Sequence, residues 1–224
     1  MNSYFKNLWI LYLKDLKCEF RSIDNMASTI VFGLMVTFII SLSLQNLDME
    51  SINIFPSLLW VVVLFTVTLG VNRSFDFEKE NKAHEALIMA VGDWSCIFFA
   101  KVISNLTLLF VVEAIIIPLY IIFNDIRFDF NYGFFLLTLI LGSCGLSLIG
   151  TLLNSIILQI RGSKLLLPVL LFPLSIPLFI AVTECTKASL IAGYIPVRWV
   201  NFLILFDLIH FLIPLFIFDY IMEN

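Results

Sequence analysis

The sequence predicts an all-α membrane protein with six membrane-spanning helices, and its composition, hydropathy and apolar runs carry that prediction. Of its 224 residues, 61% are hydrophobic and 13% are charged, whereas soluble proteins are about 45–50% apolar and about 25% charged. The mean hydropathy is +1.03. Several apolar runs approach or exceed the roughly 18 residues that mark a membrane-spanning helix. A soluble chain of this length cannot bury so much apolar surface, so we expect one membrane domain over residues 1–224.

Residues 4–21 precede the first apolar run and predict an amphipathic helix that lies in the membrane interface. The alternative is that they begin a long first span, but four basic residues in hydrocarbon would be costly. The same charges interrupt what would be the apolar core of a signal peptide. Apolar and aromatic side chains recur at helical spacing, and polar ones fall mainly on the other side: Phe5, Leu8, Trp9, Tyr12, Leu16 and Phe20 against Asn7, Lys14, Lys17 and Arg21.

Six apolar segments follow, each long enough for a membrane-spanning helix. They are residues 25–44, 54–72, 102–123, 132–158, 165–182 and 199–221. No internal repeat is visible, so an inverted-repeat transporter is not indicated.

The fourth and fifth segments carry features that predict close helix packing. In the fourth, small side chains fall four residues apart and form one face on which another helix can approach closely. In the fifth, prolines remove backbone donors and bend the helix, so we expect it to lie against other helices. The small face is Ser143, Ser147 and Thr151, and the prolines are Pro168, Pro173 and Pro177.

The basic residues predict the orientation, because cytoplasmic loops carry an excess of Lys and Arg. One side of the predicted bundle has ten, and the other has only Arg127, Lys187 and Arg198. We therefore expect both termini to be cytoplasmic. The ten are Lys6, Lys14, Lys17, Arg21, Arg73, Lys79, Lys82, Lys101, Arg161 and Lys164.

The long polar interruption between apolar segments is residues 73–101, on the expected cytoplasmic side. A cluster of charges is followed by a short apolar helical stretch and a Gly92-Asp93 turn. In a chain that otherwise lies in lipid, a soluble partner can act on such a segment, although this stretch alone favours a plain solvated loop. The chain has no G-x-x-x-x-G-K-[ST] motif, so an ATP-driven role requires a separate subunit.

Three ionisable residues lie deep in predicted spans: Glu113, Asp207 and His210. A charge at mid-membrane costs about 2.5–3.5 kcal/mol on insertion scales, so such residues tend to face a bundle interior and to be functional. Asp207 and His210 are three apart and share a helix face. One interpretation is a polar path or a contact with haem. The other is that all three are hydrogen-bonded within the bundle and have a structural role.

Other site chemistries find little support. The four cysteines form no C-x-x-C pair, the chain has only two histidines, and we expect no metal site. No basic block indicates nucleic acid binding. The G-S-C-G sequence at 142–145 with His210 is similar to the Ser and His pairing of rhomboid proteases. Cys144 stands at the nucleophile position, however, and a small-residue packing face explains the segment without catalysis.

Four stretches, taken in order and spacing, resemble the CcmB family, the membrane permease of the cytochrome c maturation ABC system. The most specific of the four is the proline-rich stretch at residues 172–181. The stretch at residues 73–101 departs from the family, because Lys82 and Val91 stand where a glycine and a proline are frequent. The four are residues 14–22; the polar segment, with Arg73, Phe75, Glu85, Leu87, Ala100 and Lys101 at matching positions; residues 141–150; and residues 172–181.

The resemblance implies an ABC-2-type permease that is not itself an enzyme. A CcmA-type ATPase would dock on residues 73–101, and CcmC-, CcmD- and CcmE-type proteins would complete the complex in a bacterial inner membrane. A homodimer is expected, since a two-fold ATPase needs two halves. The residues expected to couple to the ATPase are Arg73, Phe75, Glu78, Glu85, Leu87 and Met89.

In such a complex haem is a substrate, and we expect no cofactor bound directly by this chain. ATP hydrolysis would serve either to move haem or to release the haem-loaded periplasmic chaperone. Asp207 and His210 are outside the matching pattern, so no family role passes to them. The competing interpretations are an ABC-2-type exporter of a lipid, glycan or drug, and a scaffold that only organises a haem-handling complex.

Overall fold

The regular elements in the described part of the chain are all helices. The computed structural model describes residues 2–21, 23–44, 54–65, 68, 94–123, 131–157, 166–190 and 194–222. The helices are α1 (Asn2–Arg21), α2 (Ile23–Leu44), α5 (Trp94–Phe123), α6 (Tyr132–Ile157), α7 (Leu166–Ser189) and α8 (Val197–Met222). A shorter apolar helix, Ile54–Phe65, lies between α2 and α5 in the sequence.

Four described helices, α5 to α8, are long and apolar enough to cross a membrane. They coincide with the third to sixth expected spans. The first two expected spans coincide with α2 and Ile54–Phe65, whose described apolar parts, Ala27–Ile39 and Ile54–Phe65, are shorter than a full span. The multi-pass membrane fold is therefore confirmed, and the number six stays a prediction.

Two of the expected boundaries were wrong. Helix α5 begins at Trp94, two turns before residue 102, because its first residues pack against α1. Helix α7 continues to Ser189, well past residue 182. The polar residues that suggested an end there are accommodated by the helix itself: Lys187 pairs with Glu184 at 2.8 Å, and the Thr186 hydroxyl donates to the Val182 carbonyl at 2.7 Å.

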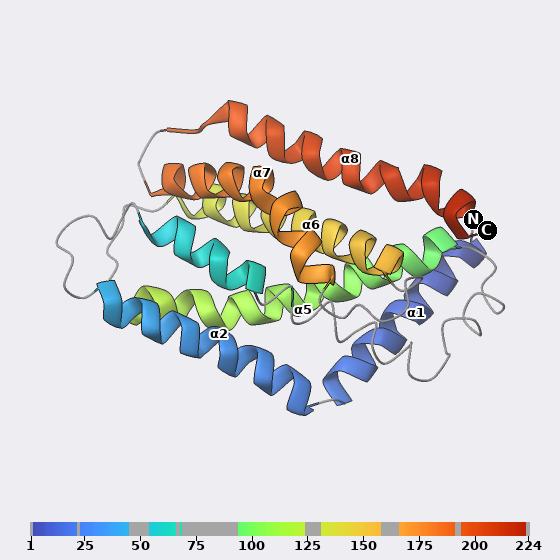
Figure 1. The fold of residues 1–224 in the computed structure, drawn as a ribbon, viewed down its shortest axis with the longest axis horizontal. Helices are drawn as coiled ribbons and strands as arrows, with labels where there is room; N and C mark the ends of the chain where they lie inside the picture. The colour runs from blue at the N-terminus through green and yellow to red at the C-terminus, as the bar shows by residue number, and fades with distance from the viewer. Residues whose placement is uncertain are drawn as a thin grey trace.

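Helix α6 is the centre of the bundle. It is the most buried of the four spanning helices and packs against α5, α7 and α8, whereas α8 is the least buried. In Figure 1, α6 and α7 lie between α8 on one side and α2 on the other. The start of α6 is capped by Asn131, whose side-chain oxygen accepts from the Phe134 N–H at 3.2 Å.

The glycines of α6 allow its neighbours to approach. A Cβ at Gly142 would overlap the Trp60 ring and come within 2.8 Å of Val182. A Cβ at Gly145 would lie 2.6 Å from the Asp207 carboxyl oxygen. Trp60 is itself held in place, because its indole N–H donates to Thr186 on α7 at 2.9 Å. These contacts bring Ile54–Phe65, α7 and α8 together around α6.

Of the three prolines expected to bend α7, two lie where they can do so. Pro173 and Pro177 lie inside the helix, and Figure 1 shows α7 changing direction along its length. Pro168, in contrast, lies in the first turn, where a missing N–H costs no helical hydrogen bond. The expected bend at Pro168 therefore has no physical cause.

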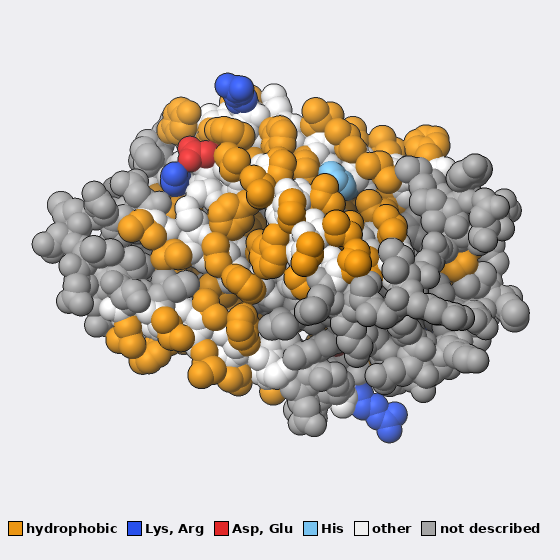
Figure 2. Space-filling model, viewed as in Figure 1, with side chains coloured by type: hydrophobic (Ala, Val, Ile, Leu, Met, Phe, Trp, Pro, Cys, Tyr) orange, Lys and Arg blue, Asp and Glu red, His pale blue; other side chains and the backbone are white. Residues whose placement is uncertain are grey.

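The outer surface suits a lipid environment. Figure 2 shows hydrophobic side chains across the middle of one face, with Lys, Arg, Asp and Glu side chains toward its edges. Large apolar side chains of α7 and α8, such as Val169, Ile176, Leu205 and Phe216, are exposed. In lipid such a surface carries no penalty.

Candidate functional site

Glu113, on α5, points at α6 in the middle of the bundle. Its side chain is 4% exposed, and its Oε1 accepts a hydrogen bond of 2.5 Å from the Ser143 hydroxyl. It also borders an apolar recess that has no room for a water molecule. Glu113 is therefore packed and hydrogen-bonded, which favours the structural interpretation of this residue. The rest of the recess is lined by Val63, Leu109, Val112, Ile116 and Ile117.

Asp207, on α8, lies on a different side of α6. Its side chain is 9% exposed and rests against Gly145. Neither of its carboxyl oxygens has a hydrogen-bond partner among the described residues. Ser143 and Gly145 are two residues apart, which places them about 200° apart around a helix. Glu113 and Asp207 consequently contact nearly opposite sides of α6.

His210 is satisfied within its own helix. Its Nδ1 lies 2.8 Å from the Phe206 carbonyl oxygen, and its ring is 4.3 Å from the Phe206 ring. It shares the inward side of α8 with Asp207, as the spacing predicted, but it is only half-buried. Glu113, Asp207 and His210 thus do not converge on one polar site.

The protease interpretation does not fit this geometry. Ser143 donates its hydroxyl proton to Glu113, and His210 bonds the backbone of α8. Cys144 packs beside the apolar cluster that includes Phe98 and Leu148. A nucleophile must lie within hydrogen-bond reach of its base, and here the Ser143 hydroxyl donates to Glu113 instead of to His210.

A seam of polar contacts joins α5 to α6. The Asn105 amide donates to Thr151 at 3.0 Å, the Ser147 hydroxyl donates to the Val102 carbonyl at 2.9 Å, and Ser143 reaches Glu113. The predicted small face therefore packs on α5, as expected for small residues in lipid. From Asn105 to Glu113 and from Thr151 to Ser143 each helix advances eight residues, so the two antiparallel helices stay in register.

Most other described hydroxyls donate within their own helix, although Thr107 also meets Tyr12 of α1 and Thr186 also accepts from Trp60. They donate to the carbonyl four residues back in their own helix, which satisfies them without a partner elsewhere. The seam residues differ because their hydroxyls reach α5. The helix-internal donors include Thr37, Ser41, Thr107, Thr138, Ser155 and Thr186.

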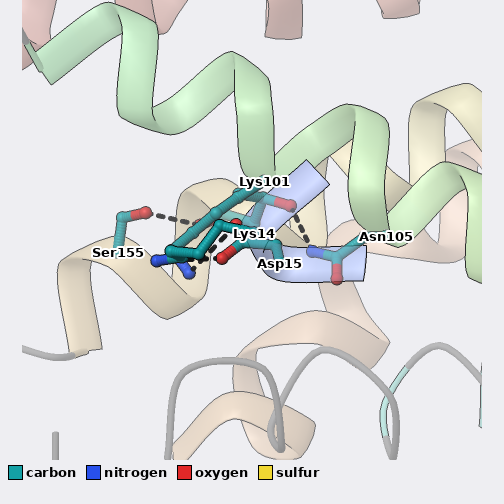
Figure 3. Close-up of polar contacts among 6 residues, drawn as sticks. Lys14, Asp15, Lys101, Asn105 and Ser155 are labelled. Carbon is teal, nitrogen blue, oxygen red and sulfur yellow. Dashed lines mark hydrogen bonds and ion pairs between the residues drawn. The ribbon is translucent and has the colours of Figure 1, made fainter. Parts of the chain in front are cut away.

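The seam ends at a buried ion pair that the sequence did not reveal. Lys101 was expected on the cytoplasmic surface, but its side chain is 2% exposed. Its Nζ lies 3.8 Å from one carboxylate oxygen of Asp15, and the other oxygen is 3.0 Å from Lys14 Nζ. Figure 3 shows these side chains meeting beside Asn105 and Ser155. The available signal was that Lys101, Asn105 and Glu113 are four and eight residues apart, which places them on one face of α5.

Asp15 comes from α1, which lies along the first turns of α5. Leu11 packs in a cluster with Cys96, Ile97 and Ala100. Two tyrosines extend this contact at both ends: Tyr4 meets Ser95, and Tyr12 meets Thr107, each with an oxygen–oxygen distance of 3.3 Å. The buried side of α1 is thus occupied by protein along most of its length.

The α1 side chains form three sectors rather than the expected two. Tyr4, Leu8, Leu11 and Asp15 face the protein. Phe5, Trp9 and Phe20, which were expected on the same side of the helix as Leu8, are exposed. The basic residues Lys6, Lys17 and Arg21 are exposed as well. An exposed aromatic sector beside a basic one is typical of a helix in the membrane interface, and that placement stays a prediction.

The residues expected to couple to an ATPase lie outside the described part of the chain. This holds for Arg73, Phe75, Glu78, Glu85, Leu87 and Met89. The structure describes the end of the polar segment, Trp94–Lys101, which forms the first two turns of α5. Among the described residues no group of three His, Cys, Asp or Glu side chains could hold a metal ion.

Comparison with known proteins gives two findings. Residues 6–222 match the family model described as CcmB protein. The chain is also 24% identical over 181 residues to heme exporter protein B of Pseudomonas aeruginosa strain PAO1, with 81% of each chain covered. The first match spans nearly the whole sequence, including α1 and all four spanning helices.

Proposed function

This chain belongs to the CcmB family and is a membrane component of a haem-handling ABC system in cytochrome c biogenesis; from that premise we propose that it couples ATP hydrolysis by a separate subunit to haem delivery or chaperone release. The chain has no nucleotide-binding motif of its own. A CcmA-type ATPase docks on residues 73–93 and supplies the energy. The chain contributes the membrane part that moves and is not itself catalytic.

One observation carries this proposal, namely the way in which the polar segment joins the bundle. Its last residues continue directly into α5 as Trp94–Lys101, and this part is buried against α1. A force that reaches Trp94 therefore acts on the end of a 30-residue helix. Helices of that length transmit displacement because their backbone hydrogen bonds are internal.

The rest of the complex follows from the family. Two copies of this chain pair with two ATPase subunits, and CcmC-, CcmD- and CcmE-type proteins handle haem beside them in a bacterial inner membrane. Figure 1 places the beginning of α1 and the end of α8 at the same end of the bundle. That arrangement supports both termini lying on one side, which the basic residues put in the cytoplasm.

Of the two roles for ATP hydrolysis, release of the haem-loaded chaperone is the better supported. Iron in haem is held by axial ligands such as His or Met. The described residues include one histidine, His210, and therefore no pair of axial histidines, and the sequence has no C-x-x-C-H motif. Haem then stays with other subunits, and this chain changes the shape of the complex.

The docking proposal is tested by charge reversal and by an apolar-to-charged change. Glu85→Lys and Leu87→Asp should each abolish co-purification of the ATPase with the tagged chain, because both place an unfavourable charge in the proposed contact. Membrane insertion should be unchanged, since both residues lie outside the spans. Asn81→Ala, in the same segment, is the matched control. Co-purification of both charge variants at the wild-type level would contradict the proposal.

A further inference from the structure

The ion pair between Asp15 and Lys101 has a position that suggests a role beyond holding two helices together. Both side chains are at least nine-tenths buried. Charges are placed in such surroundings only with a partner, since an isolated one is expensive to desolvate. Lys14 also lies 3.0 Å from the second carboxylate oxygen of Asp15. The pair therefore requires that α1 and α5 keep their relative position.

Lys101 is also the point at which three helices meet. One turn further along α5, Asn105 bonds Thr151 of α6, and Val102 accepts from Ser147 of α6. On its other side, Lys101 faces α1. A displacement of the α5 end therefore acts on α6, the central helix, through contacts directly adjacent to the ion pair.

The remaining contacts of α1 follow the same part of α5. Tyr4 meets Ser95, and Leu11 packs with Cys96, Ile97 and Ala100. These residues come immediately after the stretch 73–93 on which the ATPase is proposed to dock. Whatever moves the start of α5 must move α1 with it, or else break the buried ion pair.

We propose that Asp15 and Lys101 form a joint that makes α1 and the first turns of α5 move as one body, and that movement of the ATPase reaches α6 through this joint. The inference rests on the proposed function. Asp15 and Lys101 are positioning residues, because they act through the helices that they connect. The interfacial helix α1 is then a moving part of the coupling machinery rather than a membrane anchor.

The test measures assembly as co-purification of the ATPase, and coupling as the amount of c-type cytochrome formed per ATP hydrolysed. Asp15→Asn and Lys101→Met each leave one partner of the pair. We expect ATPase co-purification at the wild-type level but at least tenfold less c-type cytochrome formed per ATP hydrolysed. The exchanged variant Asp15→Lys with Lys101→Asp restores an ion pair and should recover that ratio to within threefold of wild type. Lys17→Gln, which changes an exposed cation of the same helix, is the matched control and should resemble wild type.

Three results would overturn the joint. The first is that both single variants form as much c-type cytochrome per ATP hydrolysed as the wild type. The second is that the exchanged variant is as impaired as the single variants. If the single variants fail to insert, the double variant Asp15→Leu with Lys101→Met is tested instead, since it retains packing without charge. The third contradicting result is a wild-type amount of c-type cytochrome per ATP hydrolysed in this double variant. If the wild-type chain itself recruits no ATPase, the proposed function fails first, so the two failures are distinguishable.

Discussion

Ser143 shows how much depends on single hydroxyls inside this bundle. It donates to Glu113, whose carboxyl group is buried between α5 and α6. Ser147, one turn away on the same face, donates instead to the backbone carbonyl of Val102. The sequence predicted the face that these serines share from their spacing. It did not predict their partners, because a packed neighbour on another helix leaves no mark in the local pattern.

We expect Ser143→Ala to destabilise the protein more than Ser147→Ala. Removing the Ser143 hydroxyl leaves a buried carboxyl oxygen without its donor, which costs about 1–3 kcal/mol. The Val102 carbonyl keeps its own helix hydrogen bond, so Ser147→Ala should cost about 0.6 kcal/mol, the average for such bonds in membranes. Unfolding of both variants in the same detergent measures the difference. Equal losses would mean that Glu113 finds another donor.

Lys101 marks the limit of residue-level prediction. A lysine next to a polar segment is ordinarily assigned to solvent, and the count of basic residues treated it so. Its burial against Asp15 depends on α1 packing along α5. That packing is a tertiary contact between segments more than 80 residues apart in the chain. The exposure of Lys101 could therefore not be read from its neighbours in the sequence.

At the scale of elements, α6 organises the bundle and its glycines are the reason. The spans themselves were predictable, because long and predominantly apolar segments leave few alternatives. The helix ends were less so, since α7 keeps polar residues in its last turns through the Lys187–Glu184 pair. The three ionisable residues were expected to share a site, and α6 separates Glu113 from Asp207.

The two glycines of α6 should differ in their tolerance of a methyl group. At Gly142 the added Cβ overlaps the Trp60 ring, which its bond to Thr186 holds in place. Overpacking of a core costs about 1–3 kcal/mol, and we expect the upper end of that range for Gly142→Ala.

Gly145→Ala should be nearly neutral by comparison. The atoms that it meets are the ends of the Asp207 and Leu178 side chains, which can shift. Replacing a helical glycine with alanine also gains about 1 kcal/mol of helix propensity, which offsets a mild clash. Thermal unfolding of both variants in detergent tests the ranking. A more stable Gly142→Ala protein would show that Trp60 is free to move.

At the scale of the whole molecule, the chain is a helical membrane protein whose family places it in a haem-handling ABC system. Its structure suggests which helices move together. Composition alone predicted the membrane fold, and the family match covers residues 6–222. Residues 73–93 of the polar segment, which hold the residues expected to couple to the ATPase, lie outside the described part of the chain. What the structure adds is the place where that segment enters the bundle, at a buried joint between α1 and α5.

The central claim is that this chain acts in cytochrome c biogenesis through a separate ATPase. The most direct measurement is the amount of covalently bound haem in c-type cytochromes of cells that lack this chain, complemented either with the wild-type chain or with Glu85→Lys. The account predicts that the deletion loses these cytochromes, that the wild-type chain restores them and that Glu85→Lys, inserted at the same level, does not. Normal c-type cytochromes in the deletion strain would contradict it.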